Sequence, residues 1–141
     1  MKSRRVISLL AVAALATTVF VGCGNKEEAK ESGLKDGTYK KTSEKDDKGY
    51  TASIEIEVKD GKIATVKYDE VGEDGTSKLN NEEYNTKMKS ISGSSPVEAF
   101  PALEEALVEK QDVTAVDAVT GATSTSDKFK TLAEEALTEA K

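Results

Sequence analysis

Residues 117–126, DAVTGATSTS, concentrate hydroxyl side chains around one glycine and one alanine, directly before a helical pattern. A carboxylate at Asp117 opens the stretch, and Gly121 permits a tight turn or a close backbone approach. Ser124, Thr125 and Ser126 can each cap a helix. Two roles are therefore open. The stretch either caps a helix and does nothing else, or its hydroxyls and the N–H groups of the helix start bind an anion such as phosphate.

The elements that position this stretch begin with strands. Apolar and polar residues alternate over 50–58, the pattern of a half-buried strand. Asp60-Gly61 then suits a two-residue hairpin turn. The return strand is expected to place Ala64, Val66 and Tyr68 on one face, and an earlier strand is expected to start within 36–42. The sequence thus predicts an antiparallel β-meander with one solvated face.

Helices are expected in the second half of the chain. Asn80 or Asn81 is expected to cap a helix that carries Tyr84, Met88 and Ile91 on one face. A second helix is expected to open with Ser95 and Pro96, and to kink or restart at Pro101. Residues 113–119 read as a short β-like run. A final amphipathic helix is expected to start near Ser126, so the predicted fold class is α+β, with helices packed on one face of the sheet.

The chain opens with a basic start and a short apolar run, which is typical of a secretory leader over residues 1–22. The run is too short to be expected as a retained membrane span. It ends at Cys23, and VGC resembles the end of a bacterial lipobox, which implies lipidation of Cys23. An ordinary secretion signal with an incidental cysteine is the alternative. Residues 23–35 are then the lipidated cysteine and a charged tether, and residues 36–141 form one domain.

Composition excludes several function classes. Three of the 20 basic residues lie in the predicted leader, so 17 basic residues stand against 26 acidic ones, a net charge of −9. Such a chain is a poor binder of nucleic acid, which requires Lys and Arg on phosphates. The chain has no histidine and one cysteine, so it lacks the commonest general base, an intrachain disulfide and the usual zinc ligands. No metal site is predicted, and the carboxylates are expected to form a solvated surface.

The segment Asp117–Thr123, DAVTGAT, resembles the flavinylation motif Asp-x-x-Ser/Thr-Gly-Ala-Thr/Ser of the FMN-binding domain family, and it matches at every defined position. Segments 36–39, 58–63, 83–88 and 95–107 resemble the same domains in Gram-positive surface lipoproteins. The resemblance implies that a flavin transferase moves FMN from FAD to the Thr123 hydroxyl through a phosphoester bond. The flavinylation loop would then lie at the N-terminus of the last helix.

The resemblance also implies roles for neighbouring residues. Asp117 would serve recognition by the transferase, while Gly121 and Ala122 would keep the attachment site accessible. Hydroxyls that are candidates to hold phosphate oxygens are those of Thr120, Ser124 and Thr125. Candidates for contact with the isoalloxazine ring are Tyr84 and Met88, with Tyr39 and Phe100 as weaker ones; for all four, a purely structural role in the core remains open.

The function implied is that of a monomeric electron carrier on the outer face of a Gram-positive cell membrane. Its donor would be a quinone pool fed by a membrane NADH dehydrogenase, and its acceptors would lie outside the cell. The domain is expected to have no substrate-activating site of its own. Two alternatives remain: a non-redox lipoprotein that binds free FMN or another phosphorylated ligand reversibly, and a structural or adhesive surface lipoprotein.

Overall fold

The structure of the protein, a computed structural model, describes residues 33–141. The predicted leader, Cys23 and most of the predicted tether lie outside the described residues. The elements are β1 (Gly37–Lys45), β2 (Tyr50–Lys59), β3 (Lys62–Gly72), η2 (Lys78–Asn80), α2 (Glu82–Ser92), α3 (Pro96–Lys110), η3 (Val113–Ala115) and α4 (Thr123–Glu139). None of the helices in this part of the chain has the length and apolar character needed to cross a membrane.

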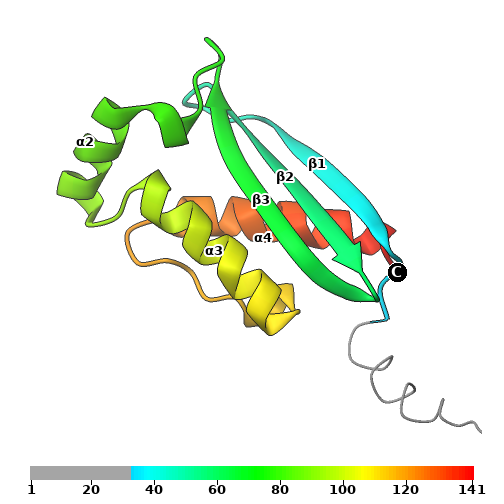
Figure 1. Cartoon of the computed structure of the whole chain (residues 1–141). Coiled ribbons are helices and arrows are strands. Elements are labelled where there is room, and N and C mark those ends of the chain that lie inside the picture. Colours follow the sequence, from blue (N-terminus) through cyan, green and yellow to red (C-terminus); the bar gives the residue numbers. More distant parts are fainter. Residues whose placement is uncertain (1–32) are drawn as a thin grey trace, which may run out of the picture. The chain divides into compact units, whose positions relative to one another are not determined.

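The strands form an antiparallel sheet in the order β1-β2-β3, and α3 and α4 cover one of its faces (Figure 1). This confirms the predicted meander and the α+β class. At the β2–β3 turn both central residues have positive φ, 54° for Asp60 and 77° for Gly61, as the two-residue hairpin requires. The polar residues that alternate with the buried residues of β2 lie on the open face of the sheet.

A β-bulge changes the predicted inner face of β3. Val58 pairs with Ile63, whereas the preceding Glu57 pairs with Thr65, so Ala64 is an extra residue on β3. Ala64 is therefore exposed and Ile63 is buried, contrary to the alternation expected from the sequence. Beyond the bulge the alternation resumes, and Val66 points inward as predicted.

The core lies between the sheet and the two covering helices. Tyr68 is at its centre, with its ring edge-on to Phe100 at 4.9 Å and to Phe129 at 5.4 Å between ring centroids. These edge-to-face contacts are a favoured geometry for aromatic pairs. Leu103 and Leu107 of α3 have no exposed surface and complete the packing beside the rings. One tyrosine on β3 thus joins both helices to the sheet.

Two helix predictions need correction, because the second helix does not restart at Pro101 and the last helix begins earlier than expected. α3 continues as one helix through Pro101, which lies on its exposed side, where water can replace the hydrogen bond that proline cannot donate. α4 begins at Thr123, about one turn earlier than expected. The Ser95 cap with Pro96 in the first turn is confirmed, as is the Asn81 cap, whose Oδ1 accepts from the Tyr84 N–H at 2.9 Å.

The segment before α4 also departs from the sequence reading. Residues 113–115 form a short 3-10 turn, and residues 116–119 pair with no strand of the described sheet. The apolar residues that suggested a strand are buried: Val113 is the first residue of this turn, and Val116 directly follows it. Hydrophobic burial without strand pairing explains why the pattern was misleading.

The end of α3 is fastened to the outer edge of β3 by a single side chain. Gln111 has a φ of 59°, and its amide both accepts from the Ile63 N–H at 2.7 Å and donates to the Ile63 C=O at 2.8 Å. These bonds satisfy a buried edge residue directly beside the bulge. Gln111 therefore determines where α3 ends against the sheet.

We expect Gln111→Ala to lower the free energy of unfolding by about 1–3 kcal/mol, because both backbone groups of Ile63 lose their partner. Urea denaturation of the purified protein measures the change. Glu109→Ala, an exposed position in the last turn of the same helix, is the control and should change little. Equal midpoints for Gln111→Ala and the parent would show that the amide contacts are dispensable.

Candidate functional site

The loop before α4 is held against the junction of α2 and α3 by Gly121. This residue has a φ of 83°, and a Cβ atom built on it would lie 2.2 Å from the Ser92 carbonyl oxygen and 3.3 Å from the Ser94 Cβ. Only glycine satisfies both the positive φ and the close approach. The glycine of the motif thus brings the start of α4 to the α2–α3 junction.

The first turn of α4 is left without a side-chain cap. Ala122 occupies the N-cap position, and the first intrahelical hydrogen bond runs from the Ser126 N–H to the Ala122 C=O. Within residues 33–141, no protein acceptor pairs with the backbone N–H groups of Thr123, Ser124 or Thr125. Unpaired N–H groups together with the helix dipole favour an anion at this position.

Ser126 has a different role from the predicted cap. It is fully buried, and its Oγ accepts from the Val119 N–H at 3.0 Å and donates to the Ala122 C=O at 2.8 Å. The side chain therefore closes the loop on itself from inside the helix. Thr123, the first helical residue, is by contrast exposed.

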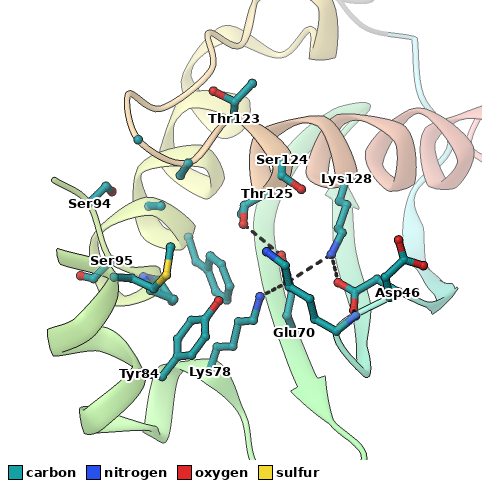
Figure 2. A pocket seen from close by; sticks show the side chains of 18 residues that line it. Asp46, Glu70, Lys78, Tyr84, Ser94, Ser95, Thr123, Ser124, Thr125 and Lys128 are labelled. Atoms are coloured by element: carbon teal, nitrogen blue, oxygen red, sulfur yellow. Dashed lines mark hydrogen bonds and ion pairs between the residues drawn. The ribbon is translucent and has the colours of Figure 1, made fainter. Parts of the chain in front are cut away.

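A cavity of about 370 Å³ opens beside this turn (Figure 2). Its walls combine the first turn of α4 with Tyr84 and Met88 of α2 and with Phe100 of α3. Tyr84 and Met88 are only half-buried, and Ile91, predicted on the same face, is 68% exposed. This face of α2 therefore lines a cavity rather than filling the core. The volume lies in the range of about 300–1,000 Å³ that is typical of ligand pockets.

Sequence-predicted residues are distributed unequally around the cavity. Those in its wall are Thr123, Gly121, Ala122, Ser124, Thr125, Tyr84, Met88 and Phe100. Thr120 is exposed and does not line it. Asp117 has a side chain 94% exposed, with a carboxylate oxygen 3.6 Å from the Lys110 Nζ. Tyr39 packs elsewhere, donating from its hydroxyl to the Lys35 C=O at 2.9 Å. The proposed roles of Asp117 and Thr120 stay predictions.

The floor of the cavity holds a carboxylate that the sequence analysis assigned to the solvated surface. Glu70 has no exposed surface, so the expectation that all carboxylates face solvent is wrong. The sequence contains one indication of this burial, because Val66, Tyr68 and Glu70 are alternate residues of β3 and therefore point to the same, inner face. No pattern in the sequence indicated its partner Lys78, which lies in a short 3-10 turn.

Glu70 is surrounded by donors from three elements. Tyr68 donates to its Oε1 at 2.9 Å and Thr125 to the same oxygen at 3.1 Å. The Lys78 Nζ lies 2.5 Å from Oε2, and the Lys128 Nζ lies 3.5 Å from it. Figure 2 shows the two lysines reaching toward Glu70 from opposite sides. The carboxylate therefore connects β3, η2 and the first turns of α4.

A second carboxylate extends this cluster to the β1–β2 turn. Asp46 accepts from the backbone N–H groups of Lys48 and Tyr50, both at 2.9 Å, and forms an ion pair with Lys128. The Asp46 side chain is 21% exposed. Lys128 thus lies between two carboxylates and ties α4 to the β1–β2 turn.

The cluster remains ionised at neutral pH. Burial by itself would raise the pKa of Glu70, but the hydrogen bond and charge of Lys78 hold that pKa below its ordinary value. Burial would likewise lower the pKa of Lys78, and Glu70 raises it above the usual range. For Asp46, the bonds from Lys128 and the turn outweigh burial and lower the pKa to about 2. Burial and the Glu70 charge raise the pKa of Tyr68, which stays a neutral donor.

Lys78 also contacts two aromatic rings. Its Nζ lies 4.2 Å from the centroid of the Tyr50 ring and 5.2 Å from that of Tyr84, within the range of cation–π attraction. The two rings are themselves 5.8 Å apart between centroids. Residues 33–141 contain no group of three or more acidic, histidine or cysteine side chains placed to hold a metal ion. The chemistry of this site is therefore that of an uncapped helix start, a charged floor and an aromatic wall.

Comparison with known proteins agrees with this geometry. Residues 22–138 match the FMN-binding domain. The chain belongs to the FMN-binding domain family. It is also similar to a 15 kDa lipoprotein of Treponema pallidum (strain Nichols), with 35% identity over 111 residues that cover 78% of this chain and 79% of the relative.

Two solved structures share the fold of this family member. A crystal structure of a protein from Clostridium perfringens has a TM-score of 0.73 and 48% sequence identity, over 76% of this chain and 88% of the other. A solution NMR structure of a protein from Clostridium thermocellum has a TM-score of 0.52 and 28% identity, over 77% and 93% of the two chains.

FMN is the cofactor of this family, and the site has the groups that FMN requires. The unpaired N–H groups at the start of α4 suit the phosphate. The half-buried Tyr84 and Met88, with Phe100 behind them, supply an apolar and aromatic wall for a flat ring. Gly121, whose built Cβ would lie 2.2 Å from the Ser92 carbonyl oxygen, permits the close packing that places this turn beside the cavity. The residues present therefore fit the cofactor.

The close approach of Gly121 can be tested against a glycine with the same backbone conformation. Gly93 has a φ of 82° but no atom within 4 Å of a built Cβ. We expect Gly93→Ala to cost about 1–2 kcal/mol of stability from the left-handed conformation alone. Gly121→Ala should cost about 1–3 kcal/mol more, because the Ser92 carbonyl must move. Thermal and urea unfolding measure both, and equal losses would contradict the close packing of the loop.

Breaking the buried ion pair should be far more damaging than breaking an exposed one. Lys78→Met leaves the Glu70 charge buried without its nearest partner, and we expect a loss of about 3–5 kcal/mol. Lys89→Met removes an ammonium whose pair with Glu98 has both side chains half exposed, and should change stability little. Urea denaturation at pH 7 compares the two. A small effect of Lys78→Met would mean that water or Lys128 replaces Lys78 beside Glu70.

Proposed function

We propose that the protein is a lipid-anchored electron carrier outside the cytoplasm, with FMN attached through a phosphoester bond to Thr123. The observation that carries the proposal is the position of the Thr123 hydroxyl. It is exposed on the first residue of α4, beside three unpaired N–H groups and at the rim of a cavity with an aromatic wall. In this proposal the attachment point, the phosphate site and the ring site would be adjacent.

The attachment reaction needs an accessible hydroxyl and a flavin transferase with FAD. The Thr123 oxygen attacks the flavin-side phosphorus of FAD, the P–O bond of the pyrophosphate breaks, AMP leaves, and the hydroxyl proton passes to a base of the transferase or to water. Two features support access to Thr123: its exposure and the small residues Gly121 and Ala122 before it. Asp117 directly follows buried Val116, and its side chain, 94% exposed, would be accessible to a transferase.

Different residues of the chain hold the phosphate and the ring of the cofactor. The N–H groups of the first turn and the Ser124 hydroxyl face the phosphate, while Tyr84 and Met88 form the wall for the ring. Thr125 donates its hydroxyl proton to Glu70, so it fixes the turn in place. When bound, FMN supplies the redox chemistry, and the protein supplies attachment, position and electrostatics.

Electron transfer without substrate activation agrees with the chemistry of the site. The chain has no histidine, and the two carboxylates at the cavity floor, Asp46 and Glu70, are held ionised by lysines. Neither is poised to exchange protons near pH 7. We propose that a membrane quinone or NADH dehydrogenase reduces the flavin, and that an acceptor outside the membrane oxidises it.

The lipid anchor is proposed from Cys23 and from the relative. The Treponema pallidum relative is a 15 kDa lipoprotein, and the leader-like start of this chain ends at its single cysteine. Two acyl chains would hold a monomer on the outer face of the membrane, at about 0.8 kcal/mol per buried methylene. The charged segment after Cys23 would keep the domain close to its membrane partner.

A reversible flavin-binding lipoprotein is the second candidate. The same uncapped turn and cavity would hold free FMN, or another phosphorylated ligand, without a covalent bond. The two functions differ in one respect, since a phosphoester retains flavin after denaturation and a reversible complex releases it.

The test is the intact mass of the chain coexpressed with a flavin transferase. We expect the mass of one FMN minus one water, retained in denaturant. Thr123→Ala should abolish the addition, whereas Ser124→Ala, which removes the adjacent hydroxyl, should keep it. An unmodified parent, with the transferase shown to be active on another substrate, would exclude the covalent carrier. Flavin released by denaturant would favour the reversible candidate.

A further inference from the structure

Lys78 is the buried cation in the wall of the cavity. Its side chain is 7% exposed, yet it lines the same cavity as Thr123 and Tyr84. Burial of an ammonium is expensive, and an ion pair in the interior adds little stability over an apolar pair of the same size. Packing alone therefore does not account for charge at this position.

The position of the Lys78 ammonium is determined from several sides. Glu70 binds it at 2.5 Å, and the Tyr50 and Tyr84 rings lie on it at 4.2 and 5.2 Å. Its backbone is also held, because the Lys78 C=O accepts from the Asn85 amide at 2.7 Å. The charge is thus preorganised rather than carried on a free side chain.

The cation, and not its partner, is the member of the pair that a ligand meets. Glu70 has no exposed surface, whereas Lys78 and Lys128 retain 7% and 25% of theirs. The other charged residues in the cavity wall are Asp46, Asp47 and Lys48. Lys128 lies between two carboxylates, Asp46 and Glu70, whereas Lys78 has one close carboxylate, Glu70.

We propose that Lys78 presents its ammonium group to the carbonyl-bearing edge of the flavin ring and thereby favours the reduced flavin. The proposal rests on the proposed function, because it assumes that the ring occupies this cavity. Reduction, with electrons from the membrane donor, increases the negative charge on that edge. A fixed cation that is itself largely buried stabilises this charge more than it stabilises the oxidised ring.

The test is the midpoint potential of the flavin in the loaded protein, measured by spectroelectrochemical titration. The variant is Lys78→Met combined with Glu70→Gln, which removes both charges and keeps an acceptor for Tyr68 and Thr125. We expect the preference for reduced over oxidised flavin to fall about tenfold, which is about 30 mV for a two-electron couple. Lys78→Arg should retain the parent potential. Lys87→Met, which removes an exposed charge from α2, should also leave it unchanged.

A second measurement needs no substitution in the pair. The ¹⁵N resonance of the Lys78 ammonium should move when the attached flavin is reduced, while that of Lys87 should not. An ammonium that serves the phosphate instead would respond to attachment of FMN and not to its reduction, which would overturn the proposal. Equal potentials of loaded parent and loaded double variant would overturn it as well. A parent that takes up no flavin would overturn the proposed function itself, a result distinct from these two.

Discussion

The buried carboxylate of Glu70 is the interaction on which the site depends. It lies at the inner face of β3 and receives donors from Tyr68 beside it, from Lys78 in η2, and from Thr125 and Lys128 in α4. An isolated charge at this depth would be very unfavourable, so the fold must supply partners around it. The partners come from elements far apart in the chain, and their convergence brings the start of α4 to the sheet.

A second constraint acts on the other side of the same turn. Gly121 approaches the Ser92 carbonyl too closely for any side chain, and Ser126 closes the loop from within. The first turn of α4 is thus held between the α2–α3 junction and the Glu70 cluster. Because its orientation is set by tertiary contacts, the helix does not need a capping side chain, and its N–H groups stay available for a phosphate.

This arrangement explains how a domain without histidine can serve redox chemistry. The cofactor carries the electrons, so the protein needs an attachment point, a phosphate site and a shaped cavity with defined charge. The two carboxylates at the floor stay ionised, and the lysines beside them give the cavity its electrostatic character. In the proposed function, α2 forms the wall for the ring through Tyr84 and Met88, which are half-buried, while Ile91 of the same helix is exposed.

Local patterns in the sequence were sufficient for the meander, the Asp60-Gly61 hairpin, the Asn81 and Ser95 caps and the motif around Thr123. Alternation, turn residues and helix periodicity act over a few residues, so they are legible without the fold. The bulge at Ala64, the burial of Glu70 and the pairing with Lys78 depend on contacts between distant segments. The start of α4 at Thr123 rather than near Ser126 has the same origin. Three competent caps stand in the sequence, and only the close packing of Gly121 and the inward hydroxyl of Ser126 determine that none of them is used.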